Sequence, residues 1–365
     1  MLKQLTRRTF LKGTGALAGG VLVGTPTETI PRIQANKHTS QAYQVALAQA
    51  DSYEREVVRE RVFTMIEQLG GLGDVVQPGN RVAIKINLTG GTWVEQQLEQ
   101  PAVETMVTHP EVTRALVEAV LEAGASEVYI VEAIADLNCW SLWGSAEIAE
   151  DFEQVKLIDL NNPRLKEPFV DVPVGENWLL YDQFKMHPIL KDVDVFMSVA
   201  KLKCHATAGV TLSMKNLVGT LPASLYMLTP ADSNRSALHG YGKQAQVRIP
   251  SVVMDLVRAR PIHFALIDGI KTAEGSEGPW TGDFNQKIAN TLVAGKNMVA
   301  TDAVAAAVMG FDPMAASFAE VPFQHCLNHL QLAAELGLGS NNPDDIDIVG
   351  MALDEVQTTF RAYGG

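Results

Sequence analysis

Short runs rich in β-branched and other apolar residues alternate with longer segments of helical periodicity along most of the chain. Residues 110–123 show the expected helix punctuation, with Pro110 in the first turn and Gly124 just past the end. Alternating strands and helices form βαβ units, which place strands parallel to one another in one sheet. The sequence therefore predicts an α/β fold, a mainly parallel or mixed sheet flanked by helices, with an irregular insertion.

The predicted elements cover residues 43–349. The predicted strands are 43–48, 81–88, 127–132, 193–200, 263–268, 291–294 and 346–349, and the predicted helices are 54–69, 110–123, 209–217, 249–259, 300–309 and 317–336. Residues 133–192 are interrupted by prolines, and we interpret them as an insertion or a smaller subdomain. Residues 219–248 are rich in loop-forming residues and are predicted to cover a site.

The amino-terminal residues MLKQLTRRTFLKGTGALAGGVLVG resemble a twin-arginine export signal, whose pattern is Ser/Thr-Arg-Arg-x-Phe-Leu-Lys. The apolar run 13–24 is shorter than the roughly 20 residues that span a bilayer. We expect a signal peptide over 1–35, cleavage after Ala35, and a single α/β domain over 36–365. The resemblance implies passage through the twin-arginine translocation machinery, a periplasmic or other extracytoplasmic location, and no stable membrane anchor after cleavage.

Acidic residues outnumber basic residues by 13, at 42 to 29. Residues 1–35 contain five basic residues and one acidic residue, so 36–365 carry 24 bases and 41 acids, a net charge of −17. Such a surface repels nucleic acids and anionic lipids. We therefore expect no nucleic-acid partner.

Cys139, Cys204 and Cys326 are widely separated, and none belongs to a CxxC pair. This pattern disfavours a cysteine-only iron–sulfur or zinc site, so we expect no iron–sulfur cluster, and it leaves open one disulfide after export. The chain also lacks a GxSxG elbow, a GxxxxGK[ST] phosphate loop and a GxGxxG turn after a strand. Serine hydrolase, P-loop and ordinary dinucleotide-binding functions lose support.

Positively charged residues gather at two predicted strand ends, against the acidic average of the chain. Lys85 and Asn87 precede the turn Thr89-Gly90-Gly91, and Lys201, Lys203 and His205 alternate at the end of the strand 193–200. Alternate residues of a strand point to one face. The helix predicted over 209–217 would align Thr207, Thr211 and Lys215, and ligands of open α/β sheets bind beyond the carboxyl ends of the strands.

An acidic, glycine-rich segment follows the predicted strand 263–268 and contains Asp268, Glu274 and Glu277. Lysines and carboxylates at one sheet edge suit a small anionic ligand, with proton transfer or a divalent metal held by oxygens. The alternative is that the lysines are solvated strand ends and the acids belong to turns. The candidate residues are His205, Lys203 and Lys215 for catalysis, Lys85, Asn87, Lys201 and Asn216 for binding, and Asp268 and Glu274 for a metal.

His325, His329 and Asp302 can each be explained by a structural role as well as by a functional one. His325 and His329 are one turn apart on the predicted helix 317–336, which is metal-ligand spacing, but no glutamate follows the first histidine as in a zincin. Asp302 opens the predicted helix 300–309, where a carboxylate favours the helix dipole, and the alternative is that it faces the predicted site.

Five segments in this order resemble the bacterial and archaeal family known as domain of unknown function 362. They are VAIKINL, THPEVTRALVEAVLEAGASEVYIVEA, KLKCHATAGVTLSMKNLVG, IDGIKTAEGSEGP and AGKNMVATDAVAAAVMGFDP, and the likeness spans about residues 81–350. Many relatives carry cysteine-rich ferredoxin segments, which this chain lacks, so the resemblance implies no electron-transfer role here. Lys85, Asn87, Lys203, His205, Lys215, Asn216, Asp268, Glu274 and Asp302 lie inside the matching segments.

Together these observations predict an exported enzyme that acts on a small anionic substrate, with or without a divalent metal. His205 would be the general acid or base in this hypothesis. The alternative is an exported protein that binds a ligand or assists a redox process without turnover.

Overall fold

The computed structural model describes residues 43–161, 168–229 and 235–365. The signal peptide and cleavage site predicted at 1–35 lie outside these residues. The described elements are β1 (Tyr43–Gln49), α2 (Arg55–Gln68), β2 (Arg81–Lys85), η1 (Thr92–Gln97), η2 (Ala102–Glu104), α3 (Pro110–Glu122), β3 (Glu127–Glu132), α4 (Cys139–Leu142), α5 (Ser145–Asp151), β4 (Val155–Asp159), β5 (Val170–Pro173), β6 (Gln183–Met186), α6 (Ile189–Asp192), β7 (Val195–His205), β8 (Gly209–Thr211), η3 (Lys215–Thr220), η4 (Ala223–Leu225), α7 (Ser236–His239), η5 (Gly242–Gln244), α8 (Ala245–Ala259), β9 (Phe264–Glu274), η6 (Pro279–Thr281), β10 (Asn285–Gly295), α9 (Met298–Val308), α10 (His329–Glu335), η7 (Pro343–Asp345), β11 (Ile346–Gly350) and α11 (Leu353–Val356), where η denotes a 3₁₀ helix.

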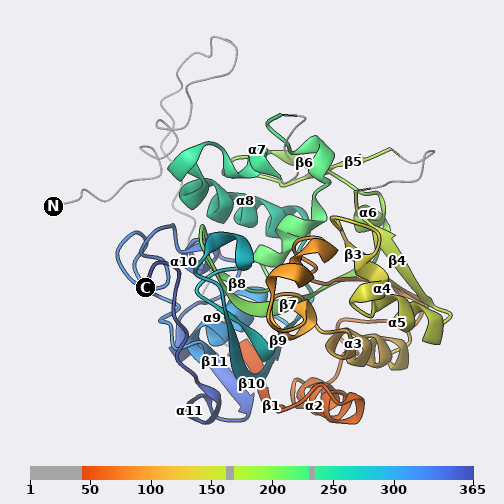
Figure 1. Cartoon of the computed structure of the whole chain (residues 1–365). Coiled ribbons are helices and arrows are strands. Elements are labelled where there is room, and N and C mark those ends of the chain that lie inside the picture. Colours follow the sequence, from red (N-terminus) through yellow and green to blue (C-terminus); the bar gives the residue numbers. More distant parts are fainter. Residues whose placement is uncertain (1–42, 162–167, 230–234) are drawn as a thin grey trace. The chain divides into compact units, whose positions relative to one another are not determined.

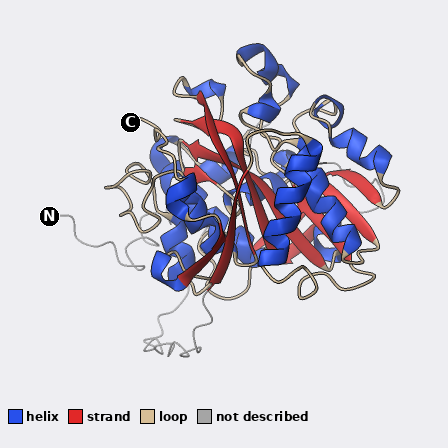
Figure 2. Cartoon of the chain, turned by 90° about the horizontal axis from the view of Figure 1, so that it is seen from below, coloured by secondary structure: helices blue, strands red, loops and turns tan. Residues whose placement is uncertain are grey.

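A nine-stranded sheet forms the centre of the described part (Figures 1 and 2). Eight strands follow the order β11-β1-β10-β9-β7-β2-β3-β4, and β8 pairs with β7 outside this order. The strands β4, β3, β2, β7 and β9 pair in parallel in this order, and β1 and β11 also pair in parallel. β10 runs antiparallel to both β1 and β9, and β8 runs antiparallel to β7. The predicted mixed, mainly parallel sheet is confirmed.

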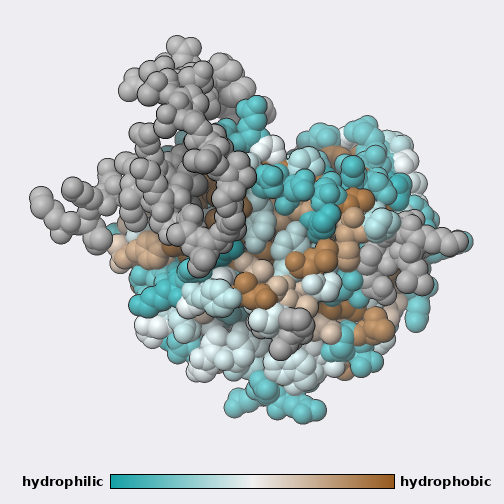
Figure 3. Space-filling model, turned by 90° about the horizontal axis from the view of Figure 1, so that it is seen from above, coloured by the Kyte–Doolittle hydropathy of each residue, from teal (hydrophilic) through white to brown (hydrophobic). Residues whose placement is uncertain are grey.

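Helices cover both faces of this sheet. One buried apolar cluster includes Val62 of α2, Leu116 of α3 and Ile84 of β2, and the other includes residues of α8, α9 and α10. Because most strands have apolar neighbours on both sides, their sequences read as continuous apolar runs. On the face drawn in Figure 3, hydrophobic residues form separate patches between hydrophilic ones. Among the described helices, none combines the length and the hydropathy needed to cross a membrane.

The irregular insertion contains two different structures. β4 joins the edge of the main sheet beside β3, whereas β5 and β6 form a separate antiparallel hairpin. Part of the segment 133–192 therefore belongs to the main sheet, and the hairpin of β5 and β6 is separate from it.

Two predicted helices are wrong. Residues 209–217 form β8, a turn and the start of η3, because pairing with β7 outweighs the local helical pattern. Of the helix predicted over 317–336, only His329–Glu335 is helical. β7 and β9 each extend to 11 residues, so they include the polar residues predicted to follow them.

Candidate functional site

The polar end of β7 lies in the protein interior. Lys201 and Lys203 have no exposed surface, and His205 is 6% exposed. The ammonium groups of Lys201 and Lys203 donate hydrogen bonds to the carbonyls of Val103 and Met106, respectively. Both lysines thus reach the same segment around η2, as alternate positions on one strand predict.

The Lys85 ammonium is neutralised by Glu132. The two residues end the neighbouring parallel strands β2 and β3, and Lys85 Nζ lies 2.9 Å from Glu132 Oε2. Lys85 Nζ also donates to the Asn216 side-chain oxygen at 3.2 Å, which accepts a second hydrogen bond from Asn87 at 3.1 Å. The structure therefore brings the predicted residues Lys85, Asn87 and Asn216 together in a buried network.

Asp302 fixes the turn that places Lys215 and Asn216. Its carboxylate, fully buried on α9, accepts hydrogen bonds from the backbone N–H groups of Ser213 and Met214 at 2.8 and 2.9 Å. Burial raises the pKa of Asp302 to about 7 even though these N–H groups favour the charged form. Because α9 begins at Met298 and has no acidic residue in its first turn, Asp302 holds this neighbouring turn instead of the start of its own helix.

Lys203 has no carboxylate within hydrogen-bonding distance in the described part of the chain. Its ammonium donates to the Met106 carbonyl at 2.6 Å. Burial lowers the pKa of Lys203 to about 7, with Glu277 acting in the opposite direction and Lys215 adding to the decrease. A lysine with this pKa exchanges a proton readily at neutral pH.

Lys215 is partly buried and makes no hydrogen bond or ion pair with any other described residue. Burial lowers its pKa to about 8, opposed by the charge of Glu277. Thr211 Oγ1 and both ring nitrogens of His329 are among the buried polar atoms that also lack hydrogen-bonding partners in the described part of the chain. Thr211 pairs with Lys203 between β8 and β7, so the two side chains share one face of the sheet.

His205 lies next to Glu277. Its Nδ1 accepts a hydrogen bond from the backbone N–H of Thr207 at 3.1 Å and lies 3.8 Å from a Glu277 oxygen. Burial lowers the pKa of His205 well below its usual value, with Glu277 opposing this shift. The ring is therefore neutral at pH 7, and the Thr207 contact leaves the ring proton on Nε2.

Glu277 is the carboxylate of this group. Burial acts to raise its pKa, but His205, the Ala206 N–H at 2.9 Å and the Trp280 indole N–H at 3.2 Å outweigh burial and hold the pKa at about 2. Glu277 is thus ionised at neutral pH. Hereafter, the lysine site means Lys203, Lys215, His205 and Glu277.

The predicted cover, residues 219–248, contributes two basic residues that the sequence analysis did not identify. Arg235 donates a hydrogen bond to the Ala133 carbonyl at 3.2 Å. Burial lowers the pKa of Arg235, and the carboxylate of Glu132 opposes this shift. His239 Nδ1 lies 3.0 Å from the Arg235 carbonyl oxygen. Burial lowers the pKa of His239, the charge of Lys215 lowers it further, and the charge of Glu277 opposes the shift. Residues 230–234 of the cover lie outside the described part.

Lys201 and Asp268 form a second buried cluster. Lys201 Nζ lies 2.8 Å from Asp268 Oδ2, and the Tyr53 hydroxyl donates to Asp268 Oδ1 at 2.8 Å. The backbone N–H of His109 also donates to Asp268, while its ring stacks on Tyr53 with the ring centroids 3.6 Å apart. The Lys201 charge is therefore already paired.

The two predicted metal ligands make separate contacts. Asp268 binds Lys201 and Tyr53, whereas Glu274, six residues further along β9, accepts a hydrogen bond from the backbone N–H of Arg361 at 3.0 Å. Across the described ranges, no group of three or more His, Cys, Asp or Glu residues is arranged to hold a metal. A metal at Asp268 and Glu274 stays a prediction.

The predicted histidine pair is also separated in its structure. His325 precedes α10 and its ring contacts that of Tyr363, whereas His329 begins α10 and its ring contacts that of Phe323. The helix that would have aligned the two histidines is absent from residues 317–328.

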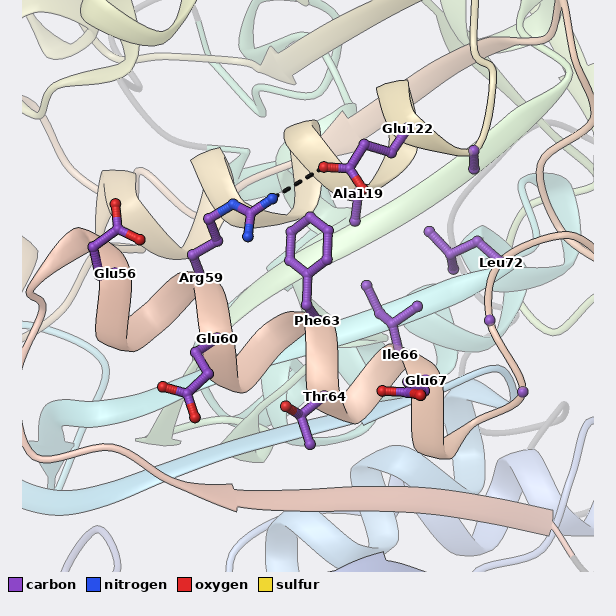
Figure 4. A pocket seen from close by; sticks show the side chains of 13 residues that line it. Glu56, Arg59, Glu60, Phe63, Thr64, Ile66, Glu67, Leu72, Ala119 and Glu122 are labelled. Atoms are coloured by element: carbon purple, nitrogen blue, oxygen red, sulfur yellow. Dashed lines mark hydrogen bonds and ion pairs between the residues drawn. The ribbon is translucent and has the colours of Figure 1, made fainter.

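A groove on the outer side of α2 and α3 contains none of the predicted site residues (Figure 4). Arg59 crosses it and lies 2.7 Å from Glu118 and 3.0 Å from Glu122, beside the ring of Phe63. Arg59 is thus paired with surface carboxylates, and the groove holds no buried charge, so the buried lysine site is the stronger candidate.

Residues 82–307 match the profile of the family described as domain of unknown function, DUF362. The chain belongs to this family. Residues 4–24 of this DUF362 protein match the twin-arginine translocation pathway signal sequence, which implies export across a membrane. Both resemblances found in the sequence are confirmed.

A thylakoid-associated protein of Synechocystis sp. is 29% identical over 320 residues, covering 86% of this DUF362 chain and 88% of the relative. A crystal structure of a Thermotoga maritima protein covers 63% of this chain and 54% of its own, with 14% identity and a TM-score of 0.35. The structural likeness is too weak to carry an argument.

Replacing Asp302 by asparagine is expected to change how stability depends on pH. The pKa of Asp302 is about 7, above its unfolded value, so the folded protein binds the extra proton and loses stability as pH rises from about 4 to about 7. A shift of this size corresponds to roughly 4 kcal/mol across that window. Asparagine removes this contribution and adds a constant cost for the N–H group that it leaves unpaired.

The measurement is urea unfolding of both proteins between pH 4.5 and 7.5. Buried histidines such as His329, whose pKa is lowered to about 3 by burial, contribute with the opposite sign, so the difference between the two proteins is the informative quantity. A difference that does not change with pH would contradict the role assigned to Asp302.

Proposed function

We propose that this protein is an exported enzyme that binds a small oxyanion at the lysine site and uses Lys203 and His205 for proton transfer. The supporting observation is Lys203, a fully buried ammonium whose sole hydrogen-bonding partner among the described residues is the Met106 carbonyl. A buried charge without a counter-charge is costly unless something compensates it. A bound anion would supply that compensation.

The local balance of charge supports an anion. Four basic groups interact electrostatically with the carboxylates of Glu132 or Glu277; they are Lys85, Lys203, Lys215 and Arg235. The carboxylate of Asp159 also interacts with Arg235. Lys85 and Glu132 neutralise each other. The described residues therefore leave an excess of positive charge in a protein that is acidic overall.

His205 and Lys203 differ in protonation state, so we assign them different roles in proton transfer. His205 is neutral with its ring proton on Nε2, so it can act as a general base at Nδ1, while its Nε2–H donates a hydrogen bond to the oxyanion. Lys203, with a pKa of about 7, is present in both charged and neutral forms near pH 7 and can accept or return a proton. Glu277 stays ionised beside His205 and stabilises the histidinium that forms if the ring gains a proton.

Titration with sulfate tests the anion site, because sulfate itself does not change its protonation near neutral pH. We expect saturable binding with uptake of up to about one proton at pH 7.5, since an anion raises the pKa of Lys203 and Lys215 from about 7 and about 8. Calorimetry in two buffers of different ionisation enthalpy measures this uptake. Sulfate that does not bind would overturn the proposal.

Chromogenic phosphate, sulfate and carboxylate esters then distinguish an enzyme from a binding protein. Turnover that His205→Ala abolishes, with sulfate affinity retained, supports the enzyme. Sulfate binding without turnover of any ester supports the alternative of a non-catalytic binding protein.

The export signal implies that the protein crosses a membrane, which supports a reaction outside the cytoplasm. We propose a periplasmic or thylakoid-lumen location, on the basis of that signal and of the thylakoid association of the Synechocystis relative.

A further inference from the structure

Two exposed tryptophans lie beside the lysine site. Trp93 is 48% exposed and Trp280 is 43% exposed, and their ring centroids are 6.3 Å apart. The indole N–H of Trp280 donates to Glu277 Oε1 at 3.2 Å, while the other oxygen of Glu277 accepts the N–H of Ala206, next to His205. One carboxylate therefore connects the exposed indole to the buried histidine.

The chain that follows β2 makes a second connection. Asn87, which is hydrogen-bonded to Asn216 beside Lys215, is followed by Thr89 and Gly90. A Cβ atom on Gly90 would lie 3.5 Å from a ring carbon of Trp280, so the backbone of this turn packs against the indole. Trp280 therefore contacts both Glu277 and the turn that follows Asn87.

The Trp280 ring is held in place by its surroundings. A Cβ atom on Gly278 would fall within 2.6 Å of three atoms of the ring, so the indole covers the bare backbone of this glycine. This packing and the hydrogen bond to Glu277 limit rotation of the side chain. Trp93 lies beside it on η1, next to the turn in which the Asp136 carboxylate accepts the Thr92 N–H at 2.7 Å.

Resting on the proposed function, we infer that the oxyanion of the ligand is attached to a flat aromatic ring, which lies against Trp93 and Trp280 while the anion occupies the lysine site. Exposed, orientated indoles offer apolar area at little cost in side-chain entropy, and aromatic rings stack on them favourably. Positive groups in the interior and aromatic groups at the surface match the two ends of such a ligand.

Benzenesulfonate and methanesulfonate test this inference, because they share an anionic group and differ in the ring. In the unaltered protein we expect benzenesulfonate to bind about tenfold more tightly, the effect of roughly one stacking contact. Trp93→Leu should remove most of this preference and leave methanesulfonate affinity unchanged. Trp178→Leu, at a tryptophan that is also 48% exposed, is the matched control and should preserve the preference.

The outcomes separate the two proposals. Equal affinities for the two sulfonates in the unaltered protein, with sulfate still bound, would overturn the aromatic ligand and leave the anion site standing. A preference that survives Trp93→Leu would also overturn it. No binding of sulfate or either sulfonate would overturn both proposals.

Discussion

Replacing Asp268 by alanine is expected to lower the free energy of unfolding by about 3–5 kcal/mol, the usual cost of removing one partner from a buried ion pair. Lys201 and Asp268 have no exposed surface, and their charged atoms are 2.8 Å apart. The substitution leaves the Lys201 ammonium in the interior with the Tyr53 hydroxyl and the Val103 carbonyl as its described partners. It also leaves the His109 N–H without its acceptor.

Guanidinium unfolding of the two proteins at pH 7 measures this effect. Asp171→Ala is the matched control, because the ion pair between Asp171 and Lys185 is of similar length, 2.9 Å, but lies on the surface, where side-chain exposures are 46% and 53%. We expect that control to change stability by less than about 1 kcal/mol. Similar losses for the two variants would contradict the assigned importance of burial.

A double variant separates the charge from the shape. Lys201→Met with Asp268→Leu removes both charges, so it should be less destabilising than Asp268→Ala alone. An equal loss in the double variant would show that the hydrogen bonds to Tyr53 and His109 matter more than the unpaired ammonium.

The sequence was sufficient to predict the fold class and to identify several residues of the site. Strand periodicity indicated that Lys201, Lys203 and His205 would share a face, and the turn after β2 indicated a polar group at Lys85 and Asn87. These predictions rest on patterns within a few residues. The structure confirms the sheet, whereas the catalytic and binding roles stay predictions.

Partners that are distant in sequence could not be predicted in the same way. Glu132 lies at the end of a correctly predicted strand, but its pairing with Lys85 depends on β2 and β3 being neighbours. Asp302 is 89 residues from Ser213, and its position at the start of the predicted helix already had a local explanation. The helix predicted over 209–217 failed because β8 gains its hydrogen bonds from β7, which a local pattern does not report.

The largest functional effect is expected from Lys203→Met. If the anion lies against this fully buried ammonium, loss of the charge should weaken sulfate binding by at least about 30-fold, since desolvated charge contacts contribute about 2–5 kcal/mol. Proton uptake on binding should fall as well, because one of the two lysines that gain protons is gone. Calorimetry at pH 7.5 gives both quantities, and Lys185→Met, at an exposed lysine, is the matched control.

Stability should move in the opposite direction to affinity in Lys203→Met. Burial lowers the pKa of Lys203 to about 7, below its unfolded value, so this lysine destabilises the fold at low pH, and stability recovers as pH rises from about 7 towards 10. Methionine has a similar length and no charge, so the variant should be more stable than the unaltered protein at pH 6 and should lack that recovery. A variant that is less stable at pH 6 and binds sulfate normally would show that Lys203 supports the fold alone. Weaker binding together with higher stability is the combination expected of a charge that the fold retains for its ligand.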